Sequence, residues 1–218
     1  MDQSSARISR TLWVGVGLVI VLVSVSFVLS RLRSRQLPVN SFPVIATVGD
    51  FTLTNQNSQV VTLDDLRGHV WVADIIFTRC AGPCPIMTQQ MKSLQDALPQ
   101  TSEAKLVSLT TDPEFDTPEI LQRYAVRFEA DTNRWTFLTG TKRQIGSLAS
   151  GSLKLSGVAT APEERKNPED LFIHSTYYVI VDKQARLRGV FETVGDGIEW
   201  PTVEQRILSA VRQLEAEQ

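Results

Sequence analysis

The chain has 218 residues, with 22 lysines and arginines against 24 acidic residues, 42% hydrophobic residues, two cysteines and two histidines. This length suits one domain, or two small ones, with a sizeable core. The ordinary content of glycine, proline and charge excludes a collagen-like, coiled-coil or wholly disordered chain. Two cysteines are too few for a disulfide-dense scaffold or a four-cysteine zinc site.

Charge is unevenly distributed along the chain. Residues 1–35 hold five arginines and one acid, which leaves 17 basic and 23 acidic side chains, a net charge of −6, for residues 36–218. Nucleic-acid binding depends on lysine and arginine side chains that neutralise phosphates. We therefore expect no nucleic-acid partner.

An apolar segment near the N-terminus predicts a membrane anchor. Residues 12–29 contain 18 residues without a charge, and as a helix they approach the roughly 30 Å of bilayer hydrocarbon. The alternative is a cleaved signal peptide, whose apolar part is usually about 7–15 residues and ends in small residues. The predicted organisation is a cytoplasmic segment over 1–11, a transmembrane helix over 12–30, a linker over 31–44 and one folded domain over 45–218.

The rest of the chain alternates predicted strands and helices, which indicates an α/β domain with a mixed central sheet flanked by helices. The long insertion 156–173 interrupts this pattern, and loops of that length are usually functional or mobile. In chain order, we expect a hairpin over 51–55 and 59–63, a buried central strand over 70–77, a helix over 85–98, a strand over 105–111, a helix over 119–128, a strand over 135–138, a helix over 142–153, a second hairpin over 177–181 and 187–191, and a closing helix over 202–214.

Both cysteines lie in the segment CAGPCP (80–85), where a predicted strand passes into a predicted helix. Pro85 suits the first turn of that helix. Cys84 then lies at the helix start, where we expect the helix dipole to lower the pKa of its thiol. Cys80 and Cys84 could close a disulfide or bind a soft metal ion such as Cu(I). Two buried core cysteines are the structural alternative. Three residues separate these cysteines, whereas a thioredoxin-type redox motif has two.

The segment DIIFTRCAGPCPIM (74–87) resembles the C-x₃-C-P segment of the Sco/SenC family, copper-binding proteins with a thioredoxin-like fold. Two further segments match that family in the same order along the chain. They are SLTTDPEFDTPEILQRYAVRF (108–128) and FIHSTYYVIVDKQARLRG (172–189). The resemblance covers roughly residues 45–195 and implies a thioredoxin-like fold for this domain.

The resemblance implies one copper ion per chain, Cu(I) or Cu(II), with Cys80, Cys84 and His174 as its ligands. The same two cysteines would form a redox-active pair that can close a disulfide. An ordinary half-buried histidine is the structural alternative for His174. The second histidine, His69, stands at a strand start and is expected at the surface.

Four further side chains near these motifs have competing interpretations. Met87 and Met91 fall on the apolar stripe of the helix after Cys84, so core packing is favoured over copper binding. Asp112 and Asp116 stand near a strand end and a helix start, which favours capping. A supporting role for Asp112 near the copper is the alternative.

The implied function is that of a membrane-anchored copper chaperone. Such a protein delivers copper to the binuclear copper site of cytochrome c oxidase, or reduces that site's cysteines. Its partner would be the copper-accepting subunit of the oxidase or another copper protein. The alternative is a thiol–disulfide oxidoreductase that uses Cys80 and Cys84 without metal, so enzymatic activity stays open. Against it, residues 174–176 contain no proline, where thioredoxin-type enzymes carry one. A thiol peroxidase and a redox or copper sensor are weaker alternatives.

The resemblance also bears on location. Family members face the bacterial periplasm or the mitochondrial intermembrane space, and the N-terminus does not look like a transit peptide. We expect a single-pass protein of the bacterial inner membrane with its soluble domain in the periplasm. The flanking arginines, two before and three after the apolar segment, slightly favour the opposite orientation.

Overall fold

The structure is a computed structural model, and it describes residues 13, 42–155 and 175–217. Residues 42–218 form a compact unit of their own. In the described stretches, no helix combines the length and the apolar character needed to cross a membrane. The anchor predicted over residues 12–30 lies outside these stretches except for Trp13, so it stays a prediction.

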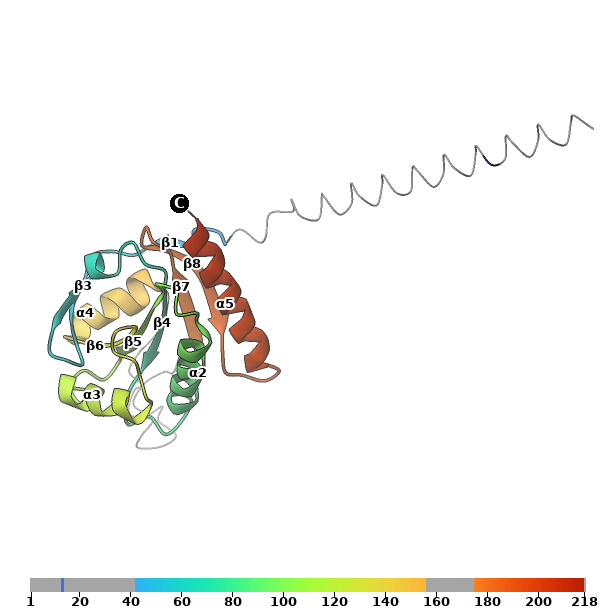
Figure 1. Cartoon of the computed structure of the whole chain (residues 1–218). Helices are drawn as coiled ribbons and strands as arrows, with labels where there is room; N and C mark the ends of the chain where they lie inside the picture. The colour runs from blue at the N-terminus through green and yellow to red at the C-terminus, as the bar shows by residue number, and fades with distance from the viewer. Residues whose placement is uncertain (1–12, 14–41, 156–174, 218) are drawn as a thin grey trace, which may run out of the picture. The chain divides into compact units, whose positions relative to one another are not determined.

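Eight strands of the described residues form one mixed sheet (Figure 1), in the order β1-β8-β7-β4-β5-β6-β2-β3. β4, β5 and β6 run parallel to one another, and the other pairings are antiparallel. The predicted mixed sheet is therefore confirmed. The strands are β1 (Ala46–Thr47), β2 (Thr52–Asn55), β3 (Val60–Thr62), β4 (Trp71–Ile76), β5 (Lys105–Thr110), β6 (Trp135–Thr139), β7 (Tyr177–Val181) and β8 (Arg186–Glu192).

Strand β4 lies in the interior of the sheet, as its run of apolar residues predicts. All six of its residues are buried, because helices cover both faces of the sheet at this point. It pairs with β5 from Trp71↔Lys105 to Ile76↔Thr110, and with β7 on its other side. The short strand β1 was not predicted. Two residues are too few to show a periodic pattern, and β1 forms only because Ala46 pairs with Leu187 of β8.

The expected helices are present, and local side chains account for their starts. In α3, the Thr117 hydroxyl accepts a hydrogen bond from the backbone N–H of Ile120, and Pro118 follows it. In α4, Thr141 and Gln144 form a capping box. The helices are α2 (Cys84–Ala97), α3 (Pro118–Arg127), α4 (Lys142–Gly146) with the π-helical turn η2 (Ser147–Ser152), α5 (Trp200–Ala216) and the 3-10 turn η1 (Leu63–Asp65).

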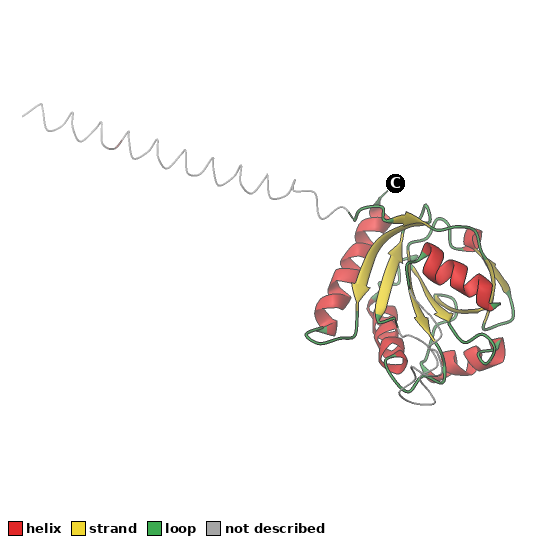
Figure 2. Cartoon of the chain, turned by 180° about the vertical axis from the view of Figure 1, so that it is seen from behind, coloured by secondary structure: helices red, strands yellow, loops and turns green. Residues whose placement is uncertain are grey.

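The domain has two hydrophobic clusters, one on each face of the sheet. Helices α2, α3 and α5 cover the first cluster, and Figures 1 and 2 show α2 beside α5. Helix α4 and η2 cover the second. The first cluster contains both cysteines together with Met87 and Met91, which are fully buried. The predicted core packing of these methionines is confirmed.

Candidate metal centre

The two cysteines lie at the junction of β4 and α2, as predicted. Cys84 is the first residue of α2, so the helix begins one residue earlier than expected and Pro85 takes its second position. Cys80 lies in the preceding loop, where the backbone N–H of Gly82 donates to its Sγ over 3.3 Å. Both side chains are thiols, with exposed fractions of 6% for Cys80 and 3% for Cys84. The folded chain thus holds two thiols together at the end of a central strand.

The pKa of the Cys84 thiol is raised far above its ordinary value, so the expectation of a lowered pKa was wrong. The largest cause is the hydrogen bond between Cys84 and Cys80, followed by burial and by the charge of Cys80. The backbone of Phe77 offsets only part of this rise. A helix dipole contributes about 0.3–1 kcal/mol at exposed sites, and loss of hydration outweighs it here. The Cys84 side chain is therefore a neutral thiol near pH 7.

Asp116 ties the loop before the cysteines to the loop that leads into α3. Its carboxylate accepts hydrogen bonds from the backbone N–H of Thr78 (3.1 Å) and from the hydroxyls of Thr78 and Thr110. Burial raises the pKa of Asp116, and these three bonds offset part of the rise. The capping interpretation of Asp116 was wrong, because Thr117 caps the helix while Asp116 faces the core.

Arg79, the residue before Cys80, forms an ion pair with Asp112. Its Nε and Nη2 both lie 2.6 Å from Oδ2 of Asp112, whose side chain is only 4% exposed. The guanidinium also lies 4.6 Å from the centre of the Phe115 ring. The Asp112 side chain thus binds the cysteine loop instead of capping a helix. Sequence reasoning missed Arg79, although its position beside the first cysteine was a usable signal.

The chain that directly follows His174 is held against α2. The Thr176 carbonyl accepts hydrogen bonds from the backbone N–H (2.8 Å) and the hydroxyl (2.9 Å) of Thr193. The Thr193 carbonyl in turn accepts a hydrogen bond from Nε2 of Gln90 in α2 (3.0 Å). The Tyr178 hydroxyl donates to the Met87 carbonyl of the same helix.

His174 itself lies outside the described residues, as does the insertion 156–173. Across 42–155 and 175–217, no group of three or more histidine, cysteine or acidic side chains could hold a metal ion. The described part supplies two of the three predicted ligands, Cys80 and Cys84, and two adjacent sulfur donors suit a soft ion such as Cu(I). The three-ligand site stays a prediction. His69 is half-buried, not fully at the surface as expected.

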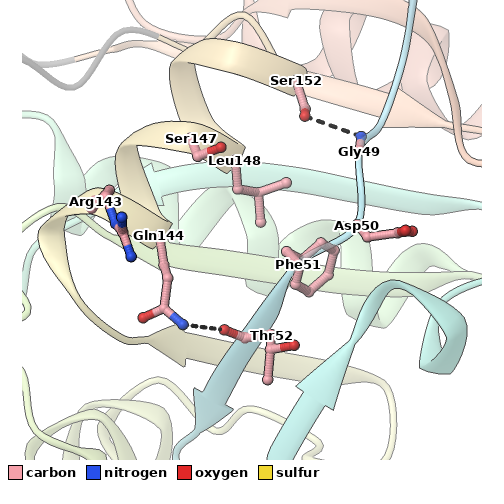
Figure 3. A pocket seen from close by; sticks show the side chains of 9 residues that line it. All are labelled: Gly49, Asp50, Phe51, Thr52, Arg143, Gln144, Ser147, Leu148 and Ser152. Atoms are coloured by element: carbon pink, nitrogen blue, oxygen red, sulfur yellow. Dashed lines mark hydrogen bonds between the residues drawn. The ribbon is translucent and has the colours of Figure 1, made fainter.

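Figure 3 shows a pocket of about 430 Å³. One of its lining residues, Leu148, belongs to the second cluster, so the pocket lies on the face of the sheet that does not carry the cysteines. Its walls come from the segment before β2 and from α4 and η2. Two hydrogen bonds connect these walls. The Gly49 N–H donates to the Ser152 hydroxyl (3.2 Å), and Gln144 Nε2 donates to the Thr52 carbonyl (2.9 Å). No cysteine, histidine or methionine lines the pocket, so it has no soft ligand for copper.

Comparison with known proteins identifies the family. The model of the SCO1/SenC family matches residues 43–206. The chain belongs to the SCO1/SenC family. This SCO1/SenC protein is 34% identical over 162 residues to the SCO1 protein homolog of Bacillus subtilis, covering 72% of this chain and 81% of that relative.

Two solved structures show the same architecture as this SCO1/SenC protein. BsSco, a member of the Sco family of cytochrome c oxidase assembly proteins, is 30% identical with a TM-score of 0.67, and the match covers 81% of this chain and 97% of BsSco. ScoI of Bradyrhizobium japonicum, solved with copper bound, has a TM-score of 0.63 at 19% identity, over 78% and 99% of the two chains. The predicted thioredoxin-like fold is confirmed.

Proposed function

We propose that this chain is a membrane-anchored copper chaperone of the Sco type, which delivers copper to the binuclear site of cytochrome c oxidase or reduces that site's cysteines. The observation that carries the proposal is the pair of hydrogen-bonded thiols, Cys80 and Cys84, at the β4–α2 junction of a SCO1/SenC chain. BsSco belongs to a family of cytochrome c oxidase assembly proteins, and Bradyrhizobium ScoI binds copper. Both facts support this function.

The proposed ligands are Cys80, Cys84 and His174, with one copper ion per chain. The hydrogen bond of Tyr178 to Met87, and the link from Thr176 through Thr193 to Gln90, support His174 as the third ligand, because they tie the residues that follow it to the cysteine-bearing helix. Two thiolates favour Cu(I) without excluding Cu(II). Copper is the cargo, and a three-ligand site leaves room for a thiolate of the copper-accepting partner during transfer.

The contacts around the cysteine loop give it a fixed shape before copper arrives. Asp116 satisfies the donors of Thr78, and the Asp112 ion pair holds Arg79, so the residues before Cys80 are anchored from a second loop. Cys84 is fixed by α2 itself. A site ordered in advance loses little conformational entropy when it binds its ion.

Copper titration tests the proposal. We expect the reduced full-length chain, in mild detergent and without oxygen, to bind one Cu(I) in competition with a chromogenic chelator. Cys80→Ser, Cys84→Ser and His174→Ala should each weaken binding more than about 100-fold, since changes beside a ligand already cost 10–100-fold. His69→Ala is the matched control and should bind like the wild type. Unchanged affinity in His174→Ala would refute the third ligand.

A thiol–disulfide oxidoreductase is the second candidate, because the same contact between the two thiols suits disulfide chemistry without metal. The same preparations decide between the two. Stoichiometric copper binding that depends on both cysteines supports the chaperone. Absence of copper binding, together with catalytic turnover of a protein disulfide, would establish the oxidoreductase.

We further propose that residues 12–30 anchor the chain in the bacterial inner membrane, with residues 1–11 in the cytoplasm and the domain in the periplasm. The uncharged run of 18 residues supports the anchor. A fusion of alkaline phosphatase after residue 40 tests the orientation, because this enzyme needs disulfides that form in the periplasm. We expect an active fusion in bacterial cells, and an inactive but stably expressed fusion would contradict the topology.

A further inference from the structure

The pocket between the segment before β2 and the helix α4–η2 has no part in the proposed copper chemistry, because it lies on the other face of the sheet from the cysteines. Its volume of about 430 Å³ falls in the lower part of the range of small-molecule sites, roughly 300–1,000 Å³. Such sites combine an apolar surface with a few polar groups, and the side chains in Figure 3 provide both. A cavity of this size and lining suits one small organic molecule.

Hydrogen bonds fix the two walls of the pocket before any ligand arrives. The Gln144 side chain is held at both ends, because its Oε1 accepts from the Thr141 N–H (2.9 Å) and its Nε2 donates to the Thr52 carbonyl (2.9 Å). The bond from the Gly49 N–H to the Ser152 hydroxyl closes the other end (Figure 3). Between these two links lies the π-helical turn η2, a rare form that is frequent at functional sites. A ligand therefore meets a preformed pocket and loses little affinity to ordering it.

The apolar part of the pocket comes from both walls. Leu148 of η2 is buried in the second cluster, and the half-buried Phe51 from the segment before β2 packs against the same cluster. A hydrocarbon group that covers these two side chains would leave water for an apolar surface, which is favourable. The floor thus favours an organic ligand over a hydrated inorganic ion.

The polar groups that remain available in the pocket are mainly donors. Arg143 carries five N–H donors and no acceptor, and among the described residues it has neither a hydrogen-bond nor an ion-pair partner. The adjacent Lys142, in contrast, lies 2.9 Å from Glu114. Ser147 adds a hydroxyl to the lining. Because Arg143 and Ser147 are four residues apart, they share one side of the helix and can donate to the same group of a ligand.

The acid of the lining, Asp50, does not neutralise Arg143. Its side chain is 93% exposed, and its Oδ1 lies 3.8 Å from Nη2 of Arg67. Figure 3 shows the Asp50 carboxylate turned away from Arg143. Water and salt screen the charge of such an exposed group. The pocket therefore presents one positive charge, that of Arg143, to a ligand.

We propose that this pocket binds a small organic monocarboxylate, at a site separate from the cysteine pair. The Arg143 guanidinium binds the carboxylate through two parallel N–H donors, the usual form of such a pair. The Ser147 hydroxyl donates to a remaining lone pair of the same carboxylate. The hydrocarbon part of the ligand covers Leu148 and Phe51. One negative charge on the ligand matches the one positive charge of the pocket.

Titration with phenylacetate tests the proposal, and phenylacetamide is the uncharged control of the same shape. The reduced, isotope-labelled full-length chain in mild detergent is titrated with each compound and followed by NMR. We expect phenylacetate to shift the signals of Gly49, Arg143 and Ser147, and to bind about tenfold or more tightly than phenylacetamide, because hydrogen bonds to a charged group are the stronger ones. Equal affinities, or shifts confined to other parts of the chain, would overturn the proposal.

Two exposed side chains provide matched variants. Arg143→Gln should weaken phenylacetate binding by about tenfold or more, since it removes the charged donor, and should leave phenylacetamide binding unchanged. Lys142→Gln removes the neighbouring charge, which is paired with Glu114 and does not line the pocket, and should bind phenylacetate like the wild type. Equal losses in the two variants would show that only the general charge of the helix acts.

Two further titrations define the ligand and the independence of the site. The tripeptide Ala-Ala-Phe ends in the same phenyl group and carboxylate, and tighter binding of the tripeptide than of phenylacetate would replace the small molecule by a peptide end. Cu(I) titration of Arg143→Gln should give the wild-type stoichiometry and affinity. A loss of copper affinity in this variant would contradict the separation of the two sites, whereas failure of the wild type to bind copper would leave the phenylacetate result unaffected.

Discussion

Arg188→Met is expected to lower the free energy of unfolding by about 3–5 kcal/mol, the usual cost of removing one partner from a buried ion pair. Arg188 is only 7% exposed, and its Nη1 lies 2.6 Å from Asp182 and 2.8 Å from Glu217. Its Nε also donates to the Phe42 carbonyl over 2.8 Å. One side chain thus joins the β7–β8 turn, the residue after α5 and the start of the domain. Urea unfolding followed by circular dichroism at pH 7 measures the loss.

The matched control is Arg186→Met, which removes an arginine from the same carboxylate. Arg186 is 36% exposed and donates to Asp182 over 2.8 Å. Because Arg188 still neutralises Asp182 in this variant, we expect a loss of about 1 kcal/mol or less, as for surface ion pairs. A loss in Arg188→Met no greater than in Arg186→Met would show that the buried network does not stabilise the domain.

The same network makes a prediction about acid stability. Burial alone would raise the pKa of Asp182, but hydrogen bonds from Arg188 and Arg186 lower it overall. A carboxyl group with a lowered pKa stabilises the folded state above its unfolded value, about 3.9, and this contribution is lost as the pH falls through the folded pKa. The wild type should therefore lose more stability than Arg188→Met between pH 5 and pH 2.

Met87→Ala is expected to cost about 2–5 kcal/mol while the chain still binds one Cu(I), because the residue is part of the core and not a ligand. Met87 is fully buried one turn after Cys84, and its carbonyl accepts the Tyr178 hydroxyl. The alanine leaves a cavity between α2 and the sheet. Urea unfolding measures the loss, and chelator competition gives the copper stoichiometry and affinity.

Two further variants make the Met87 prediction specific. Met87→Leu keeps the volume and should cost less than about 1.5 kcal/mol, with copper affinity like that of the wild type. Ile86→Ala removes an apolar side chain from the preceding position. Ile86 is 52% exposed, so this variant should change the free energy of unfolding little. If Met87→Leu lost copper affinity as strongly as a cysteine variant, the sulfur of Met87 would be a ligand after all.

The sequence alone predicted the order of strands and helices because each long element carries a local pattern. The run 70–77 is apolar and β-branched, and the helix after Cys84 repeats apolar residues at helical spacing. The position of the cysteines at the β4–α2 junction followed from the same patterns. The contacts of Arg79 with Asp112 and of Thr78 with Asp116 did not follow, because partners more than 30 residues apart meet only when β4 and β5 pair in parallel.

The fold class, the family and the two cysteines proposed as sulfur donors could all be recognised in the sequence, because motifs and periodicity are local features of the chain. The ionisation of Cys84, in contrast, depends on tertiary packing. The position of Cys84 at the start of α2 predicted a lowered pKa. Packing instead buries this thiol against Cys80, and its pKa rises. The physical reason is that hydration and charge interactions depend on which elements cover a residue, and in this domain helices from distant parts of the chain enclose the cysteine pair.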